Sequence, residues 1–166
     1  MSDERACADC GHQLQKSVES FEYDAGGVVV TLANAVLWRC PSCPFFELEI
    51  ENLQSLHETI ASILLEERRA LSGPELRWLR KFVGVPRQLI AKIIPPSSDQ
   101  ILAWETGREP VEERYSTCIR LLAAQRVRVT DFREFEQHVE EAQASSRPRP
   151  RIAKRGLTWE PEPVAA

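Results

Sequence analysis

Residues 7–43 read CADCGHQLQKSVESFEYDAGGVVVTLANAVLWRCPSC and contain four of the chain's five cysteines. These four form two C-x-x-C pairs, Cys7 with Cys10 and Cys40 with Cys43, which 29 residues separate. A C-x-x-C segment turns tightly enough for both sulfur atoms to face one point, and two such segments supply four thiolates for a tetrahedral Zn²⁺ ion. We therefore predict one structural zinc ion bound by these four cysteines.

Two other chemistries also use C-x-x-C pairs. A redox dithiol needs only one pair, at the start of a helix, and neither pair here opens an evident helix. A catalytic zinc needs an open coordination position, which four thiolates do not leave. His12 is near enough in sequence to compete as a ligand, but with four cysteines present we expect it at the surface or beside the ligands.

The segment between the cysteine pairs has the pattern of a β-hairpin. Residues 17–23 alternate apolar and polar side chains, a glycine pair at 26–27 marks a turn, and residues 28–32 are mostly β-branched. Residues 45–50 alternate again and predict a further strand. Because residues 1–51 contain little core of their own, we expect their folding to depend on the metal.

Residues 52–70 have the pattern of an amphipathic helix, with apolar residues at intervals of three and four. The apolar stripe consists of Leu53, Leu56, Ile60, Ile63 and Leu64. This stripe can pack within the chain or form a dimer seam. Packing within the chain is the interpretation we favour, because fewer than three full heptads are present.

Residues 71–144 carry the start and stop signals of several short helices. Ser72 and Glu75 have the spacing of a capping box, and Pro86 opens a second helix that Pro95-Pro96 ends. The first expected helix runs from its cap at Ser72, with Pro74 in its first turn, to Gly84, and the others lie at 87–94, 98–106, 111–125 and 131–141. Such short helices with brief joints fit a helix-turn-helix domain.

Three residues of this region are expected in the apolar core. Ile101 and Trp104 recur at helical spacing within 98–106, and Cys118 lies among apolar neighbours in the following helix. We therefore assign all three to core positions and not to a binding surface.

Composition divides the chain into parts of opposite charge. The 166 residues carry 21 basic and 25 acidic side chains, a net charge of -4, and 43% of them are hydrophobic, enough for folded cores. Residues 1–70 have a net charge of -7, whereas residues 71–128 have a net charge of +4. Of these two parts, only residues 71–128 have the positive charge that favours binding of a polyanion such as DNA.

The two ends of the chain indicate where the protein is located in the cell and which residues are disordered. No apolar run approaches the ~20 residues of a membrane-spanning helix, and the acidic N-terminus does not resemble a secretory signal, so we expect a cytoplasmic protein. Residues 145–166 are rich in Pro and Arg and are expected to form a disordered tail. The tail could follow a DNA backbone or dock a partner through residues 157–159, although a solvated terminus is the simpler interpretation.

Residues 97–110 resemble the third-helix signature of Xre/Cro-type helix-turn-helix domains. The matching positions in this segment are Ser97, Ile101, Trp104, Glu105, Gly107 and Pro110. They follow two earlier parts of the signature at the expected distance: Leu76, Leu79 and Arg80, and then Gln88 and Ala91. The cysteine pairs, with the strands between them, resemble the YgiT-type zinc finger. The two in this order, over about residues 5–125, are similar to the MqsA family of antitoxins.

The resemblance implies a zinc-binding, dimeric repressor that binds a palindromic DNA operator, controls its own operon and binds a toxin through the zinc domain. It implies that the third helix enters the major groove with Ser98, Asp99, Gln100 and Ala103. Phosphate contacts are implied for Arg87, Gln88 and Arg108. The expected organisation is α+β: a zinc-ribbon domain at 1–51, a connecting helix at 52–70, a helix-turn-helix domain at 71–144 and the tail.

Two departures from the family pattern support an alternative. Pro95-Pro96 stands where the family usually has Gly and a β-branched residue, and the Asp99 carboxylate repels phosphate, although it can accept a hydrogen bond from cytosine. The alternative is a non-enzymatic adaptor whose helix-turn-helix serves dimerisation and whose acidic N-terminal part holds a basic partner. Because no His/Asp/Glu cluster suggests an open metal site, we expect no enzymatic activity.

Overall fold

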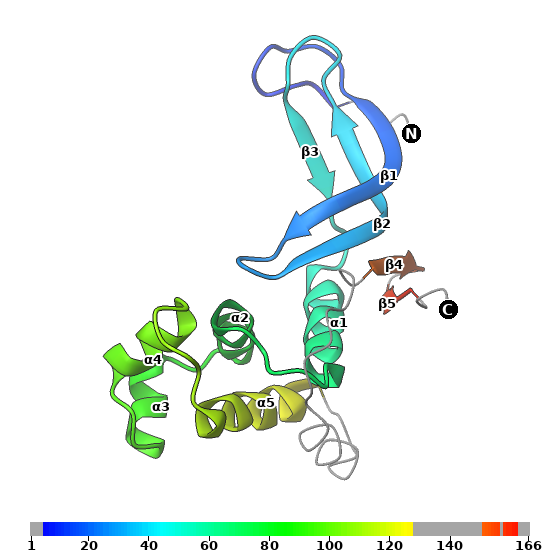
Figure 1. Ribbon diagram of the computed structural model, residues 1–166. Helices are drawn as coiled ribbons and strands as arrows, with labels where there is room; N and C mark the ends of the chain where they lie inside the picture. Colours follow the sequence, from blue (N-terminus) through cyan, green and yellow to red (C-terminus); the bar gives the residue numbers. More distant parts are fainter. Residues whose placement is uncertain (1–4, 128–150, 157, 163–166) are drawn as a thin grey trace.

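The chain forms an α+β structure in which a sheet lies at one end of a connecting helix and a group of further helices lies beside that helix (Figure 1). The computed structural model describes residues 5–127, 151–156 and 158–162. The elements are β1 (Gln15–Asp24), β2 (Val29–Arg39), β3 (Phe46–Glu49), α1 (Leu53–Glu66), α2 (Gly73–Val83), α3 (Arg87–Ile93), α4 (Ser98–Glu105), α5 (Glu113–Val127), β4 (Arg151–Arg155) and β5 (Thr158–Pro161).

β2 is the strand around which the sheet is built. β1 pairs with it antiparallel along one edge, and on the other edge β3 pairs antiparallel with its final residues. The turn between β1 and β2 is closed by Asp24, whose Oδ1 accepts the N–H groups of Gly26 and Gly27 at 2.8 and 2.7 Å. Both glycines have positive φ, which a glycine adopts without strain. The predicted hairpin and the further strand are therefore confirmed.

The expectation of disorder from residue 145 is wrong for residues 151–156 and 158–162. β4 and β5 form an antiparallel hairpin, and β4 extends the sheet by pairing in parallel with β2. The hairpin is ordered because it buries apolar side chains: Ile152 is fully buried and Trp159 is 5% exposed. This burial outweighs the Pro- and Arg-rich composition around it. Residues 145–150 and 163–166 lie outside the described part of the chain.

Helix α1 packs within the chain, as its apolar stripe predicted. Leu56, Ile60 and Leu64 are almost fully buried, and the helix contacts β5, α2 and α5. Its first turn is capped by the Asn52 side chain, which accepts the N–H of Ser55 at 2.9 Å. The helix ends at Glu66, four residues before the predicted end.

The second half of the described chain is a set of short helices whose ends follow the predicted signals. Ser72 and Glu75 form the capping box: the Glu75 N–H donates to Ser72 Oγ at 3.4 Å, and the Ser72 N–H donates to the Glu75 carboxylate at 2.7 Å. α3 ends before Pro95, and Ser97 caps α4 by accepting the Gln100 N–H at 3.1 Å. The helix expected at 131–141 lies outside the described residues.

A buried ion pair joins the first and third helices of this set. Arg80 on α2 donates through Nε and Nη2 to the two carboxylate oxygens of Glu105 on α4, at 2.5 and 2.9 Å. Arg80 also donates to the Val85 carbonyl at 2.9 Å, and the Tyr115 hydroxyl donates to Glu105. Because each charge has several partners, the pair can remain ionised in the core.

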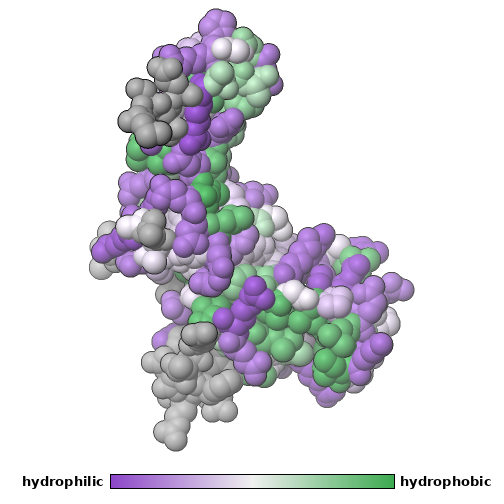
Figure 2. Space-filling model, turned by 180° about the vertical axis from the view of Figure 1, so that it is seen from behind, coloured by the Kyte–Doolittle hydropathy of each residue, from purple (hydrophilic) through white to green (hydrophobic). Residues whose placement is uncertain are grey.

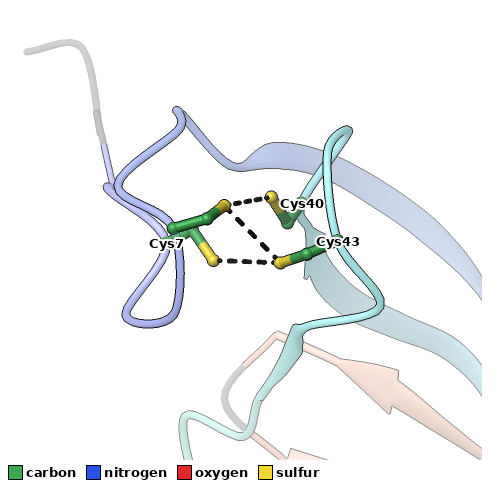
Figure 3. A group of neighbouring side chains, drawn as sticks. Cys7, Cys40 and Cys43 are labelled. Carbon is green, nitrogen blue, oxygen red and sulfur yellow. Dashed lines mark hydrogen bonds between the residues drawn. The ribbon is translucent and has the colours of Figure 1, made fainter.

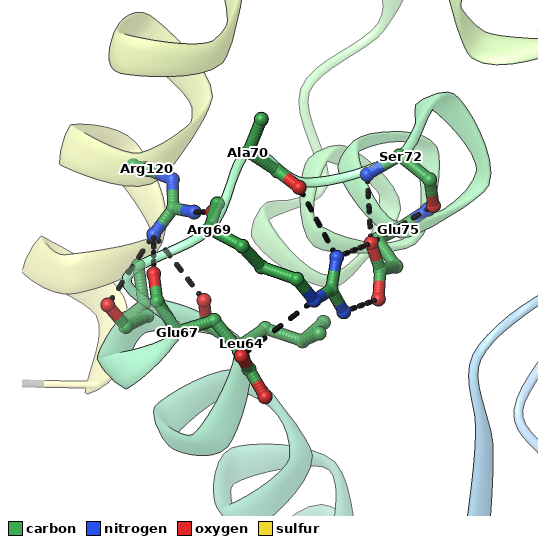
Figure 4. Close-up of polar contacts among 8 residues, drawn as sticks. Leu64, Glu67, Arg69, Ala70, Ser72, Glu75 and Arg120 are labelled. Atoms are coloured by element: carbon green, nitrogen blue, oxygen red, sulfur yellow. Dashed lines mark hydrogen bonds and ion pairs between the residues drawn. The ribbon is translucent and has the colours of Figure 1, made fainter. Parts of the chain in front are cut away.

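A second buried arginine connects α5 to the end of α1 (Figure 4). The Arg120 guanidinium donates to the carbonyl oxygens of Leu64, Leu65 and Glu67 at 3.3 Å, and to that of Arg69 at 3.0 Å. The last carbonyls of a helix lack partners within the helix. Arg120 satisfies them and thereby fixes the point where α1 turns toward α2.

Ile101 and Trp104 lie in the core as predicted, being 0% and 5% exposed. The core assignment of Cys118 is wrong, because it is only half-buried and lines an open apolar hollow of about 520 Å³ on α5, together with Leu121 and Leu122. Seen from behind, apolar residues gather on the helical half of the molecule (Figure 2). Within the described part of the chain, no helix combines the length and apolar character needed to cross a bilayer.

Candidate metal centre and exposed helix face

Four cysteine side chains converge from two loops at the end of the sheet. Their sulfur atoms all lie within 4.8 Å of one another. The shortest separations run between the loops: Cys10 to Cys40 at 3.3 Å, Cys7 to Cys43 at 3.5 Å and Cys10 to Cys43 at 3.6 Å. Figure 3 shows the labelled sulfurs of Cys7, Cys40 and Cys43 pointing toward one another. The sequence prediction that these residues come together is confirmed.

Each cysteine loop is shaped by backbone hydrogen bonds. In the first loop the Gly11 N–H donates to the Cys7 carbonyl at 2.9 Å, and Gly11 has a φ of 75°. In the second, the Cys40 N–H donates to the Phe45 carbonyl at 3.0 Å, and the Ser42 N–H points at Cys40 Sγ at 3.4 Å. These bonds hold both sulfurs of each loop on one side.

The cluster favours a bound cation because its thiols are so close. Burial would raise the pKa of Cys40, but the Ser42 N–H and the neighbouring thiols lower it to about 6. For Cys43 the Phe45 N–H lowers the pKa, while burial and the other thiols raise it to about 12. Without a cation the cluster therefore ionises only in part, since adjacent thiolates repel one another. A metal ion would favour the fully ionised form.

The geometry fits a tetrahedral ion with four sulfur ligands. A metal–sulfur distance of about 2.3 Å sets the edges of a regular tetrahedron at about 3.8 Å. The closest sulfur pairs, at 3.3 to 3.6 Å, need only a small expansion. Four cysteine thiolates suit soft or borderline ions and are poor ligands for Mg²⁺ or Ca²⁺. His12 is exposed and lies outside the cluster.

A small group of side chains surrounds the cluster. Trp38 and Leu14 are buried beside Cys7 and Cys40. Trp38 Nε1 donates to Glu49 at 2.8 Å, while the Arg5 guanidinium lies 4.4 Å from the centre of the Trp38 ring and pairs with Glu49 at 2.8 Å. The buried residues at this end of the sheet are Leu14, Trp38, Cys7 and Cys40, so two of the cysteines are part of its small interior, whereas Cys10 is exposed.

The residues expected to face DNA lie on two adjacent helices and the loop that follows them. Arg87 and Gln88 are the first two residues of α3, and Ser98 and Asp99 are the first two of α4. Gln88, Asp99 and Arg108 are exposed, whereas Arg87, Ser98 and Gln100 are partly exposed. Six of the seven predicted residues therefore have accessible surface.

Two observations change which of the seven predicted residues can contact DNA. Ala103 is only 9% exposed and belongs to the core, so the implied position of Ala103 in the major groove is not supported. Its position one turn beyond the exposed start of α4 already faces inward, beside Trp104. The Gln100 side-chain amide donates to the Glu109 carboxylate in the next loop, which restricts how it can turn toward a ligand.

Sequence reasoning missed the buried charges and the C-terminal hairpin. Arg120 lies between Ile119 and Ala123 on the buried side of α5. An arginine among apolar positions of an expected helix was the sequence feature that could have indicated a buried charge. For the hairpin, the signal was Gly156 between two short segments that contain Ile152 and Trp159. The surrounding Pro and Arg residues obscured it.

Comparisons with known proteins identify no relative. No family model matches the chain, no curated protein matches it, and no solved structure matches it. Membership of the MqsA family therefore stays a prediction, and the function has to be argued from the site.

Proposed function

We propose that the protein is a cytoplasmic, zinc-stabilised repressor of antitoxin type, which binds an operator in its own operon and holds a toxin through its N-terminal domain. The observation that carries the DNA-binding part is the arrangement of α3 and α4. A segment of four residues, 94–97, joins them. In the first turn of α4 Asp99 is exposed and Ser98 and Gln100 are partly exposed, while Ile101, Trp104 and Glu105 are buried. Two short helices joined in this way are expected of a helix-turn-helix, whose second helix enters the major groove.

Zinc is the metal we assign to the cysteine cluster. Four thiolates in a tetrahedron are the usual ligand set of structural zinc, and they leave no position for water or substrate. The ion would act as the missing core of this small sheet region. In this proposal the zinc domain has a structural and protein-binding role, and we assign no catalytic residue.

A homodimer is part of the proposal because a palindromic operator is read by two related copies. The outer face of α5 supports such a contact, since Thr117, Cys118, Leu121 and Leu122 line an open apolar hollow there. Glu113 and Arg114 lie at its edge and offer opposite charges to a two-fold partner.

Mobility shifts with DNA from immediately upstream of the gene test the proposal. Replacing Arg87 or Arg108 with Gln should weaken binding to every sequence, because phosphate contacts carry no sequence information. Replacing Ser98 or Gln100 with Ala should instead change the preferred sequence. Arg155→Gln is the charge-matched control, since its exposed side chain lies on the C-terminal hairpin. Absence of any shift at low salt, where phosphate contacts are strongest, would exclude operator binding.

The exposed apolar residues of α3 favour a second candidate, a protein-binding adaptor. Leu89 and Ile93 lie one turn apart and are 46% and 65% exposed, which is unusual for a surface that faces phosphate. In this alternative α3 contacts protein, and the acidic N-terminal sheet binds a basic partner. The double substitution Leu89→Ser and Ile93→Ser should then abolish co-purification of the protein that contacts α3. It should leave the mobility of operator DNA in the shift assay unchanged. The repressor proposal expects the double variant to retain its protein partner.

A further inference from the structure

The hairpin of β4 and β5 touches both units that α1 connects. On one side, β4 pairs in parallel with β2 at Thr31 and Leu32, so it belongs to the cysteine-bearing sheet. On the other side, β5 packs along α1, which leads into α2–α5. Figure 1 shows β4 and β5 beside the junction of the sheet and α1.

Two hydrogen bonds hold the hairpin on α1. The Thr59 hydroxyl donates to the Trp159 carbonyl at 2.6 Å, a shorter contact than its 2.9 Å separation from the Ser55 carbonyl within its own helix. The Trp159 N–H donates to Ser55 Oγ at 3.0 Å. The Trp159 side chain is 5% exposed and belongs to the main apolar core. The attachment to α1 therefore combines apolar burial with directional bonds.

The attachment to the sheet uses different residues. Ile152 is fully buried in the same apolar core as Leu32. Lys154 forms an ion pair with Glu51, at the joint between β3 and α1, and Arg151 lies within 3.5 Å of Ser20 on β1. The hairpin thus contacts the sheet, the joint and the helix at once.

Chain connectivity does not force the hairpin into this place. Residues 128–150 give a connection of 23 residues between α5 and β4. Even with the helix expected at 131–141, a segment of that length can span roughly 55 Å, whereas α1 is about 21 Å long. The hairpin could therefore leave its site while the rest of the chain remained folded, so its own contacts decide whether it stays.

We propose that the β4–β5 hairpin, residues 151–156 and 158–162, acts as a releasable clasp that fixes the orientation of the cysteine-bearing sheet relative to α2–α5. Without the clasp, the sheet is held by the chain joint at residues 50–52, by the close approach of the β1–β2 turn to α2 at Gly27 and Pro74, and by the apolar side chains of β2 that share a core with the helices. Release would allow the sheet to tilt about that joint. A molecule bound to the sheet and a molecule bound to the helices would then no longer be held in one fixed arrangement.

The test compares the full chain with a chain that ends at residue 150, both purified with zinc. Hydrogen exchange should become at least about tenfold faster at β2 near residues 31–32 and in the first half of α1, and remain unchanged in α2–α5. Small-angle scattering should show a larger maximum dimension. Unchanged exchange and unchanged scattering would overturn the proposal. Faster exchange throughout α2–α5 would also overturn it, because the hairpin would then stabilise the whole fold and not the orientation of the sheet.

A point variant keeps the test independent of truncation. Thr59→Val preserves the side-chain shape and removes the bond to Trp159, so exchange in β4, β5 and the start of α1 should increase. Ser62→Ala is the matched control, because Ser62 Oγ donates only within α1, to the Glu58 carbonyl at 3.0 Å. An equal effect of both substitutions would show a loss of helix stability and contradict the clasp.

Discussion

The guanidinium of Arg80 and the carboxylate of Glu105 form a two-point ion pair in the core, with 2.5 and 2.9 Å between the paired atoms. The residues are 8% and 1% exposed. Hydrogen bonding to Glu105 raises the pKa of Arg80, so the arginine remains charged. The pair ties α4 to α2 and thereby fixes the helix whose first turn is proposed to face DNA.

Breaking this pair should be costly. Glu105→Gln or Arg80→Met leaves one buried charge without its partner, and we expect a loss of about 3–5 kcal/mol in the free energy of unfolding. Urea denaturation followed by circular dichroism measures it. The surface pair of Arg155 with Glu160 is the control, since Arg155→Gln should cost less than about 1 kcal/mol. Equal losses in core and surface variants would contradict this prediction.

Gly73 should not tolerate a side chain. A Cβ at this position would lie 1.9 Å from the Trp104 carbonyl oxygen, so α2 and α4 would have to separate. We expect Gly73→Ala to cost about 3 kcal/mol in the free energy of unfolding. Gly84→Ala is the comparison: it has open space and only a strained φ of 83°, so about 1 kcal/mol is expected. The reverse order would show that the close approach does not matter.

Arg120 should be needed for the end of α1. Arg120→Met keeps much of the apolar stem but leaves four carbonyl oxygens without their donor, and we expect a loss of about 2–4 kcal/mol. Arg114→Met on the same helix is the control, because its side chain is 78% exposed. Thermal denaturation of both variants distinguishes them. No difference between the two substitutions would contradict the role of Arg120.

Removing the metal should affect the sheet more than the helices. A strong chelator, or Cys7→Ser, should abolish stoichiometric zinc and broaden the amide signals of residues 5–49, while signals of α2–α5 persist. Cys118→Ser is the matched control and should retain zinc, since Cys118 lies on α5, away from the cluster. Full zinc content in Cys7→Ser would exclude the four-cysteine site.

Stability should fall on mild acidification because of His57. Burial lowers the pKa of His57, whose ring lies edge-on to Trp78 with ring centroids 5.7 Å apart. Since the folded state disfavours the charged ring, stability decreases as the pH falls below the ordinary value of 6.5. Between about pH 7.5 and pH 5.5, His57→Gln should reduce this decrease in stability, and an unchanged decrease would contradict the prediction. Urea titrations at both pH values provide the measurement.

Features set by nearby residues could be predicted from the sequence, and most features set by distant residues could not. The Ser72 cap and the end of α3 before Pro95 depend on local turn and cap chemistry. The meeting of the two cysteine pairs is a long-range feature, and it could be predicted because four closely paired cysteines are a known ligand set. The Arg80–Glu105 pair and the burial of Ile152 depend on partners 25 or more residues away. Ala103 was misplaced for the same reason, because the rotation of α4 is set by what it packs against.

The parallel pairing of β2 with β4 has a consequence for synthesis on the ribosome. Leu32 leaves the exit tunnel roughly 120 residues before its partner Ile152. At about 5–20 residues per second, this delay is about 6–24 s. During that interval the cysteine loops could already capture an ion, while the edge of β2 at Thr31 and Leu32 stays open to any extended chain nearby. The nascent protein is therefore most exposed to mispairing before its last strands emerge.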